Sequence, residues 1–311
     1  MRTLRFFPLL AATVLFGCDE FRTQVELDVP DIDDQLVVNS FYTPDSLWSV
    51  LVTGHRYILN DDPIPYIDGA TVSLYSGSEL LAEVNAGDSG YYELPITPQI
   101  ETDYTLRVSH PNYPTAEVQT RLSTPIPLES LTIDSLNDIS FEGFIPGVLS
   151  LRDPGGETNY YQLILYSDIR YPLGIEPDGD TLWEEYSYPI FFQLGGTSAS
   201  AGEIIEVNAD VFGFLPGQVF SDEIFDGQLV DLTFEVYNEA SYLPPGTEWS
   251  IFAEFRSLSA DYYDYAFSLG VQRNALGNPF AQPAQVFTNV QDGLGIVAGY
   301  GRTTQDYQIL R

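Results

Sequence analysis

Short apolar runs separated by turn residues constrain the fold of this chain most strongly. Between residues 36 and 122 such runs recur seven times, and each is rich in β-branched or aromatic residues. They are residues 36–38, 48–52, 70–75, 80–84, 91–94, 104–108 and 116–122. Turn-forming residues lie between them, as in Asp68-Gly69 and Gly87-Asp88-Ser89-Gly90. Seven short strands are typical of a β-sandwich such as the immunoglobulin fold, which we predict over residues 35–124.

Pro125 and Pro127 indicate a boundary, because proline removes a donor from a strand ladder. Beyond it the strand patterns continue, at residues 131–133, 148–151, 160–166, 229–237 and 247–255. A polar, glycine-rich segment lies between Arg170 and Gly202. We therefore predict a mainly β protein with two β-sandwich domains, the second being a β-rich domain over residues 125–311.

One helix is expected within the second domain, near residues 259–273. Ser259 is a suitable N-cap, and Asp261 lies in the first turn, where the helix dipole favours an acid. Tyr262, Ala266 and Leu269 follow at helical spacing. We expect that face of the helix to pack onto a sheet.

The N-terminus has the pattern of a lipoprotein signal peptide. Arg2 and Arg5 precede an apolar run that is too short to span a bilayer, and the run ends in Leu15-Phe16-Gly17-Cys18. We predict a signal peptide at residues 1–17, a diacylglyceryl group on the Cys18 thiol, and a lipidated acidic tether at residues 18–34. An ordinary secretory signal with a chance cysteine is the alternative. The acids directly after Cys18 favour export to the cell surface.

The charge is unusual. The chain has 45 acidic and 12 basic residues, all 12 basic residues are arginine, and the net charge is −33. So strong an excess of anions excludes nucleic acid as a partner, and the lack of lysine excludes lysine-dependent catalysis. The acids are spread along the chain, which favours a surface adapted to high salt, where screening is strong. Calcium binding along acidic loops and attraction to a basic partner are the alternatives.

Candidate chemical sites are few. Asp178, Asp180 and Glu184 form a weak candidate for a calcium site, although the spacing departs from the twelve-residue calcium loop and a solvated loop explains it as well. Neither His55 nor His110 accompanies a G-x-S-x-G motif, so we expect no catalytic residue, no cofactor and no enzyme activity. Aromatic residues gather nearby and suit sugar stacking, a partner surface or core packing. They are Tyr171, Trp183, Tyr186, Tyr188, Phe191 and Phe192.

Several motifs resemble those of domain-of-unknown-function family 4249, a family of lipoproteins of the Bacteroidota. The C-terminal ones are residues 278–283, Thr288-Asn289-Val290 and Asp292-Gly293-Leu294-Gly295-Ile296. Upstream, Asp68-Gly69-Ala70-Thr71-Val72, Asp153-Pro154-Gly155, Asn159-Tyr160-Tyr161, Leu258-Ser259 and Asp261-Tyr262-Tyr263 agree in order. The first domain is also similar to the prealbumin-like sandwiches attached to carboxypeptidases.

The resemblance implies a cellular location and a class of partner, but it implies no catalytic residues. It implies an outer-membrane lipoprotein, held by membrane lipid through Cys18 and exposed at the cell surface, that serves as an accessory or ligand-presenting partner of a TonB-dependent receptor. A freestanding glycan-binding module is the alternative, and a hydrolase is a distant third.

Overall fold

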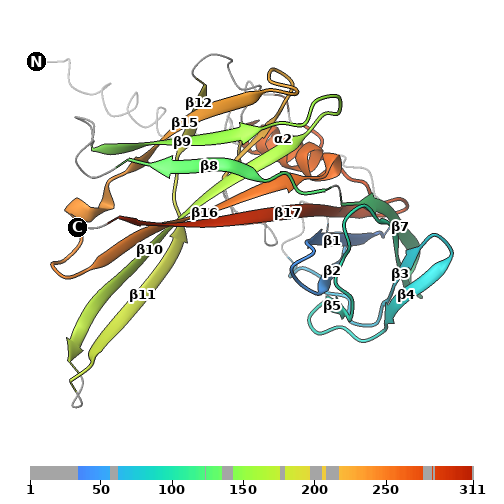
Figure 1. The fold of residues 1–311 in the computed structure, drawn as a ribbon. Coiled ribbons are helices and arrows are strands. Elements are labelled where there is room, and N and C mark those ends of the chain that lie inside the picture. The colour runs from blue at the N-terminus through green and yellow to red at the C-terminus, as the bar shows by residue number, and fades with distance from the viewer. Residues whose placement is uncertain are drawn as a thin grey trace, which may run out of the picture. The chain divides into compact units, whose positions relative to one another are not determined.

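The computed structural model describes residues 34–56, 62–122, 124–134, 143–175, 179–196, 205–207, 217–275, 282 and 284–309. Strands dominate these residues (Figure 1). The elements are β1 (Leu36–Tyr42), β2 (Trp48–Gly54), β3 (Thr71–Ser76), β4 (Glu79–Val84), β5 (Tyr91–Leu94), β6 (Asp103–His110), β7 (Tyr113–Arg121), β8 (Leu128–Ile133), β9 (Phe144–Arg152), β10 (Tyr160–Ile175), β11 (Thr181–Pro189), β12 (Gln193–Gly196), β13 (Ile205–Val207), β14 (Gly217–Ser221), β15 (Leu229–Tyr237), the 3-10 helix η2 (Glu239–Ser241), β16 (Glu248–Leu258), α2 (Ala260–Ala275) and β17 (Leu294–Ile309).

The seven strands predicted before residue 123 are confirmed as β1 to β7. Their burial follows the alternation in the sequence, since every second residue of β1 is buried, from Leu36 to Tyr42. The mainly β fold class, with sandwich packing and one α-helix among the described residues, is likewise confirmed. The likeness of residues 35–124 to prealbumin stays a prediction.

The largest sheet has nine strands. Their order is β13-β14-β10-β16-β17-β1-β2-β5, with β11 paired to β10. β1 and β17 are parallel, and Val37 to Tyr42 pair with Leu294 to Gly299. The other pairings in this sheet are antiparallel. The sheet therefore runs through both halves of the chain.

Two hydrophobic cores lie on this shared sheet. The first is built by β1 to β7 and encloses Trp48 and Tyr92, and it also contains Val290 and Val297 from the C-terminal end. In it the sheet β4-β3-β6-β7 packs on β5-β2-β1-β17. The second core lies between β10, β14 and β16 on one side and the sheet β12-β15-β9-β8 on the other, around Tyr161 and Phe255.

The boundary predicted near residue 125 needs correction in one respect. It falls between the two cores, but it does not separate two sheets. β17 supplies Val297 to the first core, and it joins β1 to β16 of the second sandwich. The physical reason is that β1 would otherwise be an open edge, and β17 supplies the hydrogen-bonding partner that residues 35–124 lack on that side.

The predicted helix is confirmed as α2. The Ser259 hydroxyl accepts a hydrogen bond from the backbone N–H of Tyr262 at 3.4 Å, as expected of an N-cap. Tyr262 and Ala266 are buried against β16 and β17, where they contact the cluster of Leu258 and Ile296, while Leu269 is half-buried. Within the part of the chain that the structure describes, no helix combines the length and the apolar character needed to cross a bilayer.

Candidate functional site

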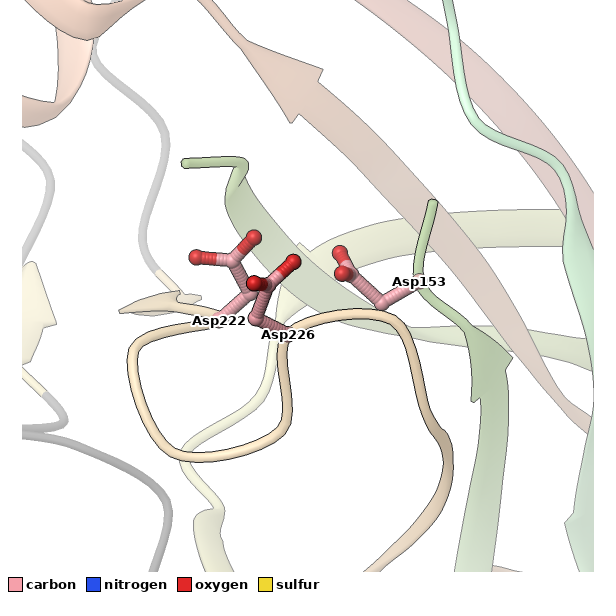
Figure 2. Close-up of side chains that lie close together, drawn as sticks. All are labelled: Asp153, Asp222 and Asp226. Atoms are coloured by element: carbon pink, nitrogen blue, oxygen red, sulfur yellow. The ribbon is translucent and has the colours of Figure 1, made fainter. Parts of the chain in front are cut away.

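Three aspartates from two loops that are far apart in the sequence converge at one end of the second sandwich. Asp153 follows β9, Asp222 follows β14, and Asp226 lies four residues further along the same loop. One carboxylate oxygen of each lies within 4.8 Å of those of the other two. Figure 2 shows the three side chains close together, with Asp222 and Asp226 on one loop and Asp153 on the other segment. Because β9 and β14 belong to different sheets, this aspartate cluster joins the two layers of the sandwich.

Hydrogen bonds fix all three carboxylates. Asp153 accepts from the Tyr161 hydroxyl on one oxygen and from the Gly227 N–H, at 2.8 Å, on the other. Asp222 accepts from both the backbone and the side-chain N–H of Asn159, at 2.8 and 3.2 Å. Asp226 accepts from the Gly156 N–H at 2.9 Å. The cluster thus fastens residues 153–159 to residues 222–228.

The close approach of three carboxylates changes their electrostatics. Burial raises the pKa of Asp222 above its ordinary value, and the charges of Asp153 and Asp226 raise it further, against the hydrogen bonds from Asn159. Burial, together with the hydrogen bond to Asp153, also raises the pKa of Tyr161. A negative site of this kind is favourable for a cation.

The cluster could hold a divalent metal ion. Calcium binds carboxylate oxygens and needs six to eight ligands, of which three aspartates supply a part. All three carboxylates already accept hydrogen bonds, so the arrangement acts as a clasp between loops whether or not a cation joins it. The sequence contained a signal for one member of this cluster, Asp153, and for its hydrogen-bonding neighbour Asn159, since both belong to the motifs singled out above. Asp222 and Asp226 were missed because 45 acids hide any particular pair.

The sequence-predicted site residues lie elsewhere. Cys18 and Asp178 lie outside the described residues, as do residues 1–17 and all of the tether but Asp34. Asp180 precedes β11, and Glu184 lies within that strand. The Glu184 carboxylate accepts hydrogen bonds from the hydroxyls of Tyr171 and Tyr186. These bonds hold the pKa of Glu184 below its ordinary value, so its charge is stabilised by tyrosine donors.

The hairpin of β10 and β11 extends beyond the rest of the sheet (Figure 1). Pairing of β10 with β16 ends at Arg170, whereas pairing with β11 continues to Ile175. We call residues 171–175 and 181–188 the arm. Its large side chains are exposed, by 79% at Ile175 and 55% at Leu173. The sequence indicated the aromatic residues of this segment but not the strand pair that projects them.

Comparison with known protein families identifies the family of the chain. One family model, described as a domain of unknown function (DUF4249), matches residues 22–306. The chain belongs to the DUF4249 family. A comparison with curated proteins finds no match.

The motifs of this DUF4249 chain serve as packing devices where the structure describes them. The Asn289 side chain exchanges two hydrogen bonds with the backbone of Val297, at 2.9 and 3.1 Å, and donates a third to Asp261 at the start of α2. Asp68 accepts from the Gly90 N–H at 2.6 Å. These motifs therefore lie at junctions between elements, and the exposed arm is the candidate for contact with other molecules.

Proposed function

We propose that this DUF4249 protein is a non-enzymatic lipoprotein of the outer membrane. In this proposal Cys18 carries the lipid anchor, the folded part is exposed at the cell surface, and the protein serves as an accessory or ligand-presenting partner of a TonB-dependent receptor. The single observation that carries the docking role is the exposed apolar surface of the arm. The family resemblance supports the choice of receptor.

The arm has the properties of an interaction element. Leu173, Ile175 and Leu182 are exposed in a chain whose surface is otherwise strongly acidic. A two-stranded ribbon has no core of its own, so these side chains can be buried only by a partner. Several large apolar side chains exposed on one projecting element mark a candidate contact site.

Cross-strand contacts hold the arm in one shape. The rings of Tyr171 and Tyr186 stack with centroids 5.6 Å apart, and both hydroxyls donate to Glu184. On the opposite face the Arg170 guanidinium lies 4.3 Å from the ring centre of Trp183. A ribbon ordered in advance loses less conformational entropy on binding, which favours docking.

The tether is long enough for this role. Leu36, the first residue of β1, lies 18 positions after Cys18, and an extended chain of that length spans roughly 60 Å. The sheet could thus stand clear of the lipid surface and reach a neighbouring receptor. Replacing Cys18 with alanine should release the protein from the membrane fraction or leave the precursor uncut. Normal membrane retention of a correctly cut Cys18→Ala protein would contradict the anchor.

Affinity purification from detergent-solubilised outer membranes tests the docking role. We expect the tagged wild-type protein to bring down a TonB-dependent receptor. The double variant Ile175→Asp/Leu182→Asp should lose it, because charges replace the apolar contact. Leu80→Asp is the matched control, since Leu80 is 49% exposed on β4, in the first sandwich. Recovery of no receptor with the wild-type protein would contradict the proposal.

A freestanding glycan-binding module is the second candidate. The specific observation in its favour is that each face of β11 carries an aromatic ring beside a carboxylate: Tyr186 with Glu184 on one face, and Trp183 with Glu185 on the other. This candidate predicts glycan retention by the protein with no receptor in the same purification.

A further inference from the structure

One face of the central sheet beside the arm is not covered by either core. Residues that pair across strands share a face, and Ile169 and Trp249 of the opposite face lie in the second core. Arg170, Glu185 and Glu248 therefore share the open face, since Arg170 pairs with both. All three are substantially exposed, with side chains accessible by 44%, 72% and 52%.

Two rows of polar side chains form a band across this face. Glu185, Arg170 and Glu248 make the first row, in which Arg170 lies 3.1 and 3.2 Å from the two carboxylates. Ser187, Asp168 and Ser250 make the second row. The band lines a shallow cavity of about 550 Å³, which is within the usual range for small-ligand sites.

Aromatic rings bound the band at both ends. Trp183 lies beyond the first row, opposite Pro172, with the Arg170 guanidinium over its ring. Tyr166 and Phe252 pair directly beyond the second row, with ring centroids 5.7 Å apart. Six residues of β10 separate these two ends, a span of roughly 20 Å. The open face thus carries a strip that begins at Trp183, continues through the polar band and ends at Tyr166 and Phe252.

The charges of the strip select the class of ligand. Three carboxylates repel anions, while Arg170 stands among them and already neutralises part of their charge. The band offers guanidinium donors, carboxylate acceptors and two serine hydroxyls that do both. A neutral molecule with many hydroxyl groups matches this mixture, because each hydroxyl both donates and accepts. The apolar faces of sugar rings suit the aromatic ends.

We infer that the strip from Trp183 to Tyr166 and Phe252 is a binding site for a neutral oligosaccharide several rings long. This inference deepens the proposed function, because it names the ligand that the protein presents. Only the presentation of the glycan to a receptor rests on the proposed function; the binding of the glycan does not. The exposed apolar side chains of the arm, Leu173, Ile175 and Leu182, would contact the receptor, while its polar face from Trp183 to Ser187 would belong to the glycan site.

Isothermal titration of the purified mature protein tests the site without any receptor. The probes are hexasaccharides of glucose, mannose, galactose and xylose, all neutral, together with a hexapeptide that contains two arginines. We expect at least one hexasaccharide to bind with a dissociation constant of about 1 mM or tighter. Trp183→Ala should weaken it at least tenfold, and Ser187→Arg should abolish it by filling the middle of the band.

A matched control and a clear contradiction complete the test. Tyr91→Ala removes an aromatic ring that is 54% exposed on β5, outside the strip, and should leave binding unchanged. Circular dichroism checks that each variant is folded. Binding of none of the hexasaccharides, binding of the peptide alone, or equal binding by wild type and Ser187→Arg would overturn the inference. None of these results depends on whether a receptor co-purifies.

Discussion

Val38 of β1 and Gly295 of β17 are paired in parallel register, and a Cβ atom on Gly295 would lie 2.2 Å from the Val38 carbonyl oxygen. Gly295 also has a φ of +106°, in the region that favours glycine. Both the contact and the backbone angle exclude a side chain here. This pair joins β1 to β17, the first and the last of the described strands, within the nine-stranded sheet.

Gly295→Ala should therefore destabilise the whole protein. We expect the free energy of unfolding to fall by about 3 kcal/mol, because the strands must separate to admit a methyl group and the backbone is strained as well. Gly77→Ala is the control: its φ is +58°, but no atom lies within 4 Å of the added Cβ, so about 1 kcal/mol is expected. Urea denaturation followed by circular dichroism measures both. Equal losses would contradict the packing described.

Residues 35–124 should not fold alone. Without β17 one edge of β1 is unpaired, and the first core loses Val290 and Val297. We expect a fragment ending at Thr124 to give the poorly dispersed amide spectrum of an unfolded chain, while the full mature protein unfolds in one transition. A fragment with dispersed amide signals and a cooperative melt would show that the first sandwich is autonomous.

Asp222→Asn should stabilise the protein at neutral pH. The folded state raises the pKa of Asp222. Protonated Asp222 therefore contributes stability that is fully present below the ordinary aspartate pKa. This stability is lost as the pH rises through the raised pKa of the folded state. The asparagine keeps an oxygen for the Asn159 donors but carries no charge. Thermal melts in EDTA from pH 4 to 7 should show a smaller fall for this variant than for wild type.

Glu223→Gln removes a neighbouring exposed acid and provides the control for that series. It should melt with the same pH dependence as the wild-type protein. A lower melting temperature for Asp222→Asn than for wild type at pH 7 would contradict the prediction. It would mean that contacts outside the aspartate cluster compensate the charge of Asp222.

High salt should stabilise the mature protein. Arg107 is paired with Glu117 and Arg121 with Glu101, and the chain has only 12 arginines for its 45 acids, so the arginines cannot neutralise most of the acidic charge. Raising sodium chloride from about 0.1 to about 1 M shortens the screening length from about 10 to about 3 Å. We expect the melting temperature to rise by about 5 °C, since weakened repulsion outweighs the loss of weak surface pairs. An unchanged melting temperature would refute a salt-adapted surface.

The first seven strands and the helix could be predicted because their signals are local. Alternation sets the buried face of β1, and Ser259 begins α2 through its own hydroxyl. The parallel pairing of β1 with β17 could not be predicted, because it joins residues about 260 positions apart and local patterns do not record partners.

The arm and the aspartate cluster show the same limit. Leu182 and Tyr186 lie in a segment that reads as polar and rich in glycine, and a strand pair exposed on both faces has no alternation to detect. Asp153 stood out in a motif, but its partners Asp222 and Asp226 are brought to it by the stacking of two sheets.

Photo-crosslinking in cells tests the central claim most directly. A photoreactive amino acid is placed at Leu182 on the arm and, as a control of similar exposure, at Leu80 on β4; these side chains are 46% and 49% exposed. The proposed function predicts a crosslink to a TonB-dependent receptor from position 182 and none from position 80. No receptor adduct from position 182, or equal adducts from both positions, would contradict the arm as the docking element.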